Sequence, residues 1–168
     1  MIITEIEPFI DYFRKIRQRT NRVIEAIPHD MMDWTYKEGK FTLGDIVRHI
    51  VAIERFMYAE NVQFKPTAYT GCGKNLAETY QEIMDFYQNC HQESLEIFEK
   101  LSPTQLQQKC ITPTGIHITI WKWLRAMIEH EIHHRGQIYI YLSILGVKSP
   151  PLYGLTSEEL IELSSNRS

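Results

Sequence analysis

The 168-residue sequence has few cysteines, no long apolar run and little net charge. Its three cysteines, Cys72, Cys90 and Cys110, are widely spaced and form no CxxC pair, which favours reduced thiols in a cytoplasmic protein over a disulfide framework. No stretch approaches the roughly 20 apolar residues of a membrane span, and the acidic start, MIITEIEPFIDYF, is unlike a secretory signal peptide. The formal net charge of -3 gives no broad basic surface. We therefore expect a cytoplasmic protein that binds neither membranes nor nucleic acids.

The sequence also contains no repeat, low-complexity tract or interdomain linker, so we expect a single domain over residues 1–168. What it does contain is helical periodicity, with apolar residues recurring at steps of three and four. Thr42, with Asp45 three positions later, is a good N-cap for one of these segments. We predict helices over Glu5–Ile27, from Thr42 onward, over Leu76–Leu101, over Ile120–Leu145 and, as a short C-terminal helix capped by Ser157, over Glu158–Leu163.

Four amphipathic segments of this length predict an all-α fold, a four-helix bundle. Strand signal is confined to one short extended pair that turns at Thr114–Gly115. The connections between the predicted helices are longer than those of a minimal up-down bundle. We expect these loops to cover one end of the bundle.

Three of the seven histidines lie on helix stripes that are otherwise apolar. His130 and His134 are four residues apart, so their imidazoles share one helical face and can converge on one ion. His49 lies among isoleucines on the second helix, where an unpaired buried polar group would cost on the order of 1–3 kcal/mol. Spacing alone leaves two interpretations open: a divalent metal site on His49, His130 and His134, or core histidines satisfied by hydrogen bonds.

The stretch from His130 to His134 also spells HExxH, the zinc peptidase signature, with Glu131 at the position of the general base. A third ligand would have to come from Glu158 or Glu159, beyond a glycine and a pair of prolines. The sequence offers no predicted edge strand to align a peptide. A metallopeptidase is therefore the least favoured of the alternatives.

Two stretches, TLGDIVRHIVAIERF and HEIHHRGQIYIYLSILGVKSPPLYGL, resemble the DinB/YfiT-like superfamily of metal-dependent proteins. In that family the fourth helix carries HxxxHRGQ, present here from His130 to Gln137, and the second helix supplies a further histidine, which matches His49. The resemblance implies a four-helix bundle, often a homodimer. It also implies that His49, His130 and His134 coordinate one divalent metal ion, with nickel or zinc favoured over iron or manganese.

Characterised members of that superfamily include thiol-dependent S-transferases and isomerases that use bacillithiol, mycothiol or glutathione. The resemblance thus implies a metal-dependent transferase, or a hydrolase, that acts on a small-molecule substrate with a low-molecular-weight thiol as cosubstrate. A triad of histidines leaves metal positions open, and the charge of the ion favours the thiolate form of a thiol. The alternative is a non-catalytic dimeric bundle whose histidines bind a structural metal or fill the core.

The residues that follow His134 are the remaining candidates. Gln137, one turn further along the helix, is the single weak candidate for a catalytic residue, either at an open metal position or as a hydrogen-bond partner of a ligand. A hydrogen bond across the bundle would explain it equally well. Gly136 is expected to permit close helix approach, and Arg135 to pair with a carboxylate such as Glu54 or Glu60.

Overall fold

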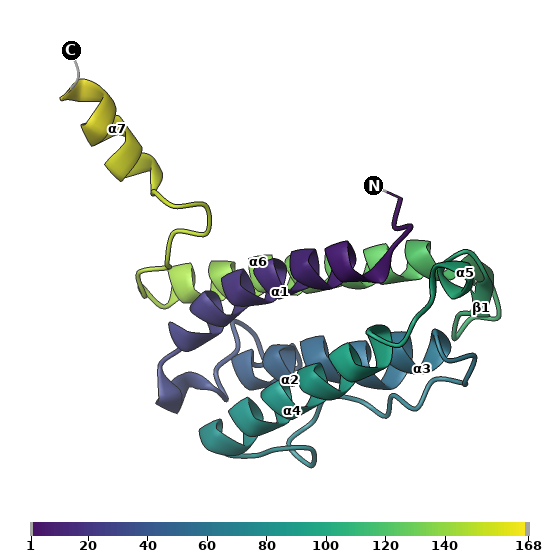
Figure 1. Ribbon diagram of the computed structural model, residues 1–168. Helices are drawn as coiled ribbons and strands as arrows, with labels where there is room; N and C mark the ends of the chain where they lie inside the picture. The colour runs from purple at the N-terminus through teal and green to yellow at the C-terminus, as the bar shows by residue number, and fades with distance from the viewer. Residues whose placement is uncertain (1, 167–168) are drawn as a thin grey trace.

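The computed structural model describes residues 2–166, and its long helices form two layers (Figure 1). One layer pairs α1 (Ile6–Glu25) with α6 (Ile120–Ile144), and the other pairs α2 (Leu43–Ile53) with α4 (Tyr80–Phe98). The second helix continues through a π-helical turn, η2 (Glu54–Tyr58), into α3 (Ala59–Asn61). The predicted all-α four-helix bundle is confirmed.

The shorter elements include the predicted extended pair. It is a two-stranded antiparallel sheet of β1 (Lys109–Ile111) and β2 (His117–Thr119), with Cys110 opposite Ile118. The others are helical: η1 (His29–Met31), α5 (Pro103–Leu106) and α7 (Ser157–Ser165).

Capping boxes set the starts of α2, α4, α5 and α7. Thr42 caps α2 as predicted, since its hydroxyl accepts from the Asp45 amide at 3.0 Å and the Asp45 carboxylate accepts from the Thr42 amide at 3.0 Å. The prediction that the third helix begins at Leu76 was wrong, because α4 is capped by Thr79 and the Ala77 carbonyl accepts a bond from the side chain of Arg48 instead. The cap of α7 is Thr156 rather than the predicted Ser157.

The four long helices run up, down, down and up. Two contacts show that the helices of the α2–α4 layer are parallel. Near their starts, a Cβ added at Gly44 would meet Ile83 at 3.2 Å, and toward their ends Arg55 bonds Glu93 at 2.7 Å. The connections over residues 26–42 and 99–119 lie at opposite ends of the bundle, so the expectation that the loops cover one end was wrong (Figure 1). The connection over residues 62–79 instead returns along its length, because α4 must start beside the start of α2 (Figure 1).

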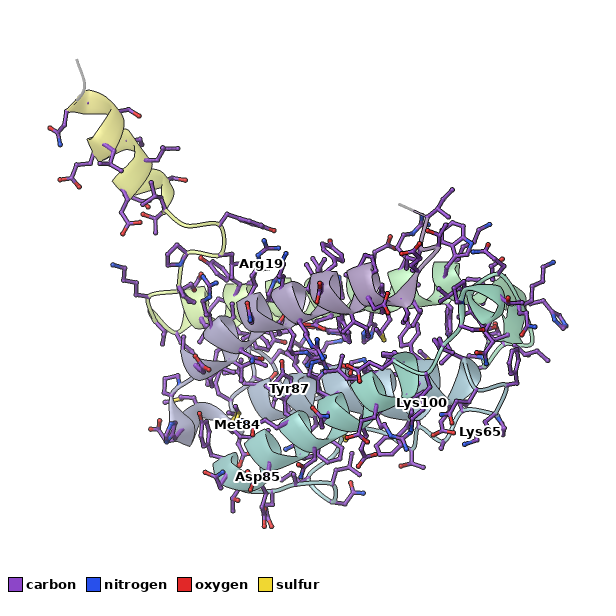
Figure 2. The ribbon with its side chains drawn as sticks, in the orientation of Figure 1. Arg19, Lys65, Met84, Asp85, Tyr87 and Lys100 are labelled. Atoms are coloured by element: carbon purple, nitrogen blue, oxygen red, sulfur yellow. The ribbon has the colours of Figure 1, made fainter. Side chains whose placement is uncertain are left out.

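The core consists of two apolar clusters, one centred on Phe13, Phe98 and Leu124 and the other on Ile24, Ile46 and Leu142. Buried charged side chains of α1, η2 and α6 lie within the bundle as well. Figure 2 shows Tyr87, labelled, on the side of α4 that faces the other layer. The bundle is therefore held by apolar packing and by an internal polar network, described below.

The C-terminal helix α7 lies apart from the bundle (Figure 1). None of its residues is buried, and Leu160 and Ile161 are 57% and 66% exposed. Among residues 2–166, no helix is both long and apolar enough to span a membrane.

Candidate metal centre

The three predicted ligand residues meet between α2 and α6. The Nε2 atom of His130 lies 3.2 Å from Nε2 of His49 and 3.1 Å from Nε2 of His134. One ring nitrogen of each histidine lies within 4.8 Å of the others, and this triad is the one group of three or more potential ligands of this kind in the described chain. The antiparallel pairing of α2 and α6 brings His49 to the face on which His130 and His134 lie one turn apart.

The spacing of these nitrogens fits a divalent ion. At a metal–nitrogen distance of about 2.05 Å, two ligand nitrogens are about 2.9 Å apart for a right angle at the metal and about 3.3 Å apart for a tetrahedral angle. The two separations from His130, 3.2 and 3.1 Å, fall between these values, and the three ligand atoms lie within 4.8 Å of one another. Imidazole is a ligand that suits zinc, nickel, copper and iron. The donor set and the two separations from His130 are therefore compatible with the metal that the sequence predicts.

The outer ring nitrogens of two of the histidines have hydrogen-bond partners. Nδ1 of His49 lies 2.8 Å from the hydroxyl of Tyr69, and Nδ1 of His134 lies 3.0 Å from Oε1 of Gln137. An amide oxygen can only accept, so His134 carries its proton on Nδ1 and presents a lone pair at Nε2. Gln137 is thereby a hydrogen-bond partner of His134, which agrees with one of the three interpretations given above for this residue.

Sequence reasoning missed Tyr69, because nothing in the 62–79 loop indicates that its path returns past His49. That path is fixed by Arg48, which is buried and adjacent to His49 in the sequence. Its guanidinium donates to the carbonyls of Cys72 at 2.7 Å and Ala77 at 2.9 Å. It also pairs with Asp45 at 2.6 Å, so one side chain of α2 anchors the loop that covers the histidines.

The histidines are held in the neutral form. Burial lowers the pKa of His49 to about 4, with a further contribution from His134. Burial also lowers the pKa of His130 to about 3, and the neighbouring histidines add to this effect. Burial lowers the pKa of His134 too, although its bond to Gln137 acts in the opposite direction. At neutral pH each ring is thus neutral and keeps one nitrogen unprotonated, so no second proton competes with a metal ion for that nitrogen.

Glu131, the second letter of HExxH, points away from this centre. Its carboxylate accepts from Thr20 at 2.6 Å and pairs with Arg17 at 3.0 Å, both on α1. Arg17 also bonds Glu54, which in turn lies 2.9 Å from Nδ1 of His91. Burial raises the pKa of Glu131, offset in part by Arg17. Burial alone would raise the pKa of Glu54 as well, but Arg17 and His91 hold it below its ordinary value.

The network gives the peptidase hypothesis no general base, because Glu131 is engaged on a different face of α6, by Thr20 and Arg17 of α1. Glu158 and Glu159, the suggested third ligands, lie on or beside the C-terminal cavity rather than in the histidine cluster. Among the described residues, HExxH thus supplies two histidines of the triad and one carboxylate that is bound to α1.

Two predictions for the following residues were wrong. Arg135 is buried but pairs with neither Glu54 nor Glu60, because Glu54 bonds Arg17 and Glu60 bonds Arg55. Gly136 does not permit a close helix contact within the chain, since a Cβ added there would meet no atom within 4 Å.

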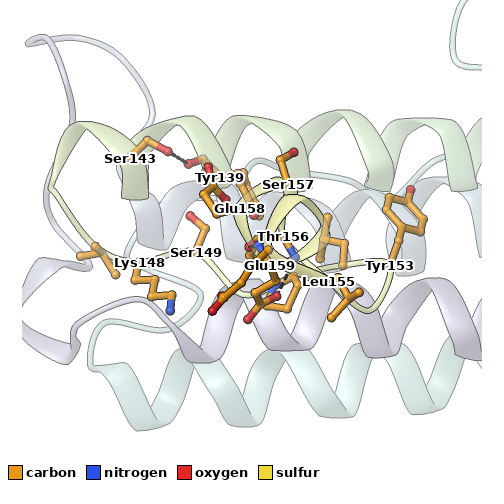
Figure 3. A pocket seen from close by; sticks show the side chains of 14 residues that line it. Tyr139, Ser143, Lys148, Ser149, Tyr153, Leu155, Thr156, Ser157, Glu158 and Glu159 are labelled. Atoms are coloured by element: carbon orange, nitrogen blue, oxygen red, sulfur yellow. Dashed lines mark hydrogen bonds between the residues drawn. The ribbon is translucent and has the colours of Figure 1, made fainter. Parts of the chain in front are cut away.

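A depression of about 340 Å³ opens beside the centre, with His134 and Gln137 in its wall. Its other walls include Tyr36, Phe41 and Tyr141, and Lys40 contributes an ammonium group. This depression gives a small molecule access to His134, which is the histidine of the triad that lines it. The larger cavity drawn in Figure 3, about 710 Å³, lies between the end of α6 and residues 147–162 and has none of the three histidines in its wall.

Comparisons with known proteins identify a family and related folds. The family model described as DinB family matches residues 3–164. An uncharacterized protein of Bacillus subtilis strain 168, YjoA, is 25% identical over 146 residues, which span 86% of this chain and 93% of YjoA.

Solved structures show the same fold. A DinB-like protein from Bacillus cereus ATCC 10987 superposes with a TM-score of 0.75 at 20% identity, over 91% of this chain and 100% of that one. The structure of YjoA gives a TM-score of 0.70 at 22% identity, over 88% and 97%. A four-helix bundle protein, TT2238, gives 0.63 at 16% identity, over 81% and 99%.

Proposed function

The chain belongs to the DinB family, and from this and the geometry of the histidines we propose that it binds one divalent metal ion through His49, His130 and His134. We propose further that it uses this ion to act on a small molecule as a transferase or hydrolase, with transfer of a low-molecular-weight thiol favoured. The observation that carries the proposal is the convergence of three neutral Nε2 atoms beside a depression that opens at the surface. Nickel or zinc is the favoured ion, and iron or manganese would suit the same site less well.

When bound, such an ion would supply a positive charge that lowers the pKa of a thiol or of water bound at an open metal position. The chain supplies orientation. Gln137 holds the proton of His134 on Nδ1, and Tyr69 offers its hydroxyl oxygen to Nδ1–H of His49, so that both Nε2 lone pairs face inward. The aromatic walls of the depression would receive the apolar part of a substrate and exclude water from it.

Metal analysis of the full chain, prepared without a histidine tag, tests the first half of the proposal. We expect about one metal ion per chain, lost in His49→Ala, His130→Ala and His134→Ala. His133→Ala is the matched control, because His133 is exposed and lies on the same helix outside the triad. If the folded wild-type protein takes up no nickel or zinc, the alternative holds in which the three histidines are core residues satisfied by hydrogen bonds.

The second half is tested by turnover of electrophiles with thiol cosubstrates, and of esters and amides without them. We expect turnover that requires metal and disappears in His134→Ala but persists in His133→Ala. Protein that binds metal stoichiometrically and turns over nothing would favour the non-catalytic alternative, a bundle with a structural metal.

The proposal includes a homodimer. Its support is an exposed apolar stripe on α6, where Ile140 and Ile144 are 61% and 59% exposed, together with α7, which is too short to be stable alone. The acidic first turn of α7 complements the basic second half of α1, where Lys15 and Arg22 are exposed. Sedimentation should show a dimer that Ile144→Lys dissociates, whereas a monomeric wild-type protein would contradict the dimer without affecting the metal site.

The cysteines suit a cytoplasmic location, which remains part of the proposal. Cys72, Cys90 and Cys110 are all free and buried. Such thiols need no oxidising compartment.

A further inference from the structure

A second cavity, of about 460 Å³, lies at the opposite end of the bundle from α7, between the segment over residues 61–67 and strand β1. Figure 2 shows Lys65, which lines it, at this end of the molecule. Asn61 is twelve residues beyond His49 on a continuous helical segment, so about 18 Å of helix axis separates the cavity from the histidines. The cavity is therefore separate from the metal centre.

We propose that this cavity binds a small organic carboxylate with an apolar, preferably aromatic, body and a hydroxyl or N–H donor. The volume falls in the range of small-molecule sites. Phe64 and Ile111 supply large apolar side chains, each 54% exposed, which a ligand would cover.

The charge of the cavity is positive. Lys65 and Lys109 line it together with His117, and its wall contains no carboxylate. Neither lysine forms an ion pair with any residue in the described part of the chain, although the protein as a whole is acidic. Two unpaired ammonium groups beside apolar walls favour an anion with an apolar body over a cation or a neutral sugar.

Asn61 is the reason why we expect the ligand to carry a hydroxyl or N–H donor. Its Nδ2 atom donates to the Lys65 carbonyl at 3.1 Å, which fixes the orientation of the amide. Its Oδ1 atom is buried and has no hydrogen-bond partner in the described chain. Buried acceptors are rarely left unpaired. A hydroxyl or N–H of a ligand would satisfy it after a small shift of the cavity wall that now covers this oxygen.

The backbone supplies an independent indication. The helix ends with the Lys65 amide bonded to the Glu60 carbonyl at 3.1 Å and the Phe64 amide bonded to the Asn61 carbonyl at 2.9 Å. This ending needs a left-handed residue, a position that glycine fills without strain. Phe64 occupies it with a φ of 63° and is the one non-glycine residue at positive φ in the described chain. Such strain persists where the side chain is needed, and here the ring forms a wall of the cavity.

The probe for the test is 3-(4-hydroxyphenyl)propionate, titrated into the metal-loaded full chain and followed by amide NMR shifts. We expect saturable shifts over residues 61–67 and 109–117. The neutral amide of the probe should bind about tenfold more weakly, and 3-phenylpropionate, which lacks the donor, should also bind more weakly. Absence of saturation, or equal affinity for the acid and its amide, would overturn the proposal.

Charge-reversed variants test the two lysines. Lys65→Glu and Lys109→Glu should each weaken binding by about tenfold or more, whereas Lys15→Glu, an exposed lysine on α1, should not. His130→Ala should lose the metal and retain the probe. Loss of the probe in His130→Ala would mean that the acid binds at the metal centre, and the proposal would fail.

Phe64→Gly separates a ligand wall from a merely structural role. Glycine relieves the strain, so the variant should melt at a higher temperature than the wild type while binding the probe several-fold more weakly. Unchanged affinity would remove Phe64 from the site and would contradict the proposal.

Discussion

The Nε2 atoms of His49 and His130 lie 3.2 Å apart, although 81 positions separate the two residues in the sequence. The two histidines meet because α2 and α6 pack antiparallel with His49 level with His130. The 62–79 loop also holds His49, because Tyr69 contacts its outer nitrogen, Nδ1. The metal centre is thus built by two helices and a returning loop.

Removing the Tyr69 hydroxyl should weaken metal binding. We expect Tyr69→Phe to lower the affinity for zinc or nickel by about 10- to 100-fold with little loss of stability, because the phenol holds the ring of His49 in place. Competition with a chromophoric chelator measures this. Tyr12→Phe, on the exposed side of α1, is the control, and equal affinities in the two variants would contradict the role of Tyr69.

Removing the cation of the buried network should destabilise the fold. Arg17→Met leaves Glu54 and Glu131 buried without their common partner, and we expect a loss on the order of 3–5 kcal/mol in the free energy of unfolding. Arg14 lies on the same helix as Arg17 and forms an exposed ion pair with Glu99. Arg14→Met breaks this pair and should cost about 0–1 kcal/mol. Urea denaturation of the two variants would refute the expectation if their midpoints moved alike.

The metal-free protein should lose stability in mild acid. The pKa of His49 is about 4 and that of His130 about 3 in the folded chain, against 6.5 for an ordinary histidine. Between these values the unfolded chain binds more protons, so the contribution of these histidines to stability falls as the pH drops below about 6.5. It is constant at higher pH.

Urea unfolding across this pH range measures the slope. His130→Gln cannot titrate and should show a shallower dependence than the wild type. Identical slopes for the two proteins would show that other groups cause the pH dependence.

Two helical glycines should respond in opposite directions to alanine. Gly136→Ala should raise stability by about 1 kcal/mol, because the helix gains propensity and the new methyl group meets nothing within 4 Å. Gly44→Ala should lower stability by about 1–3 kcal/mol, because its Cβ would lie 3.1 Å from the Met32 carbonyl and 3.2 Å from Ile83. Thermal melts in the Ile144→Lys background, which the dimer proposal makes monomeric, test both. A Gly136→Ala that destabilises the protein only without Ile144→Lys would indicate that this face of α6 packs against another molecule.

The convergence of His49, His130 and His134 was predictable because the signal of each residue is local. His130 and His134 are one helical turn apart, and His49 shares an apolar stripe with its neighbours, so periodicity alone directed all three inward. The partners of these residues were not predictable. Tyr69 lies on an irregular loop, and the ion pair of Glu131 with Arg17 depends on the rotation of α1 against α6, which periodicity does not specify.

The sequence by itself determined the helices, the class of fold and the identity of the three histidines, because spacing along one helix fixes which side chains share a face. Only the tertiary structure decided the up-down-down-up order, since a connection as long as residues 62–79 permits either direction of return. It also decided that Glu131 stabilises the bundle instead of serving the metal centre. Adjacent residues on a helix point about 100° apart, so His130 faces α2 while Glu131 faces α1.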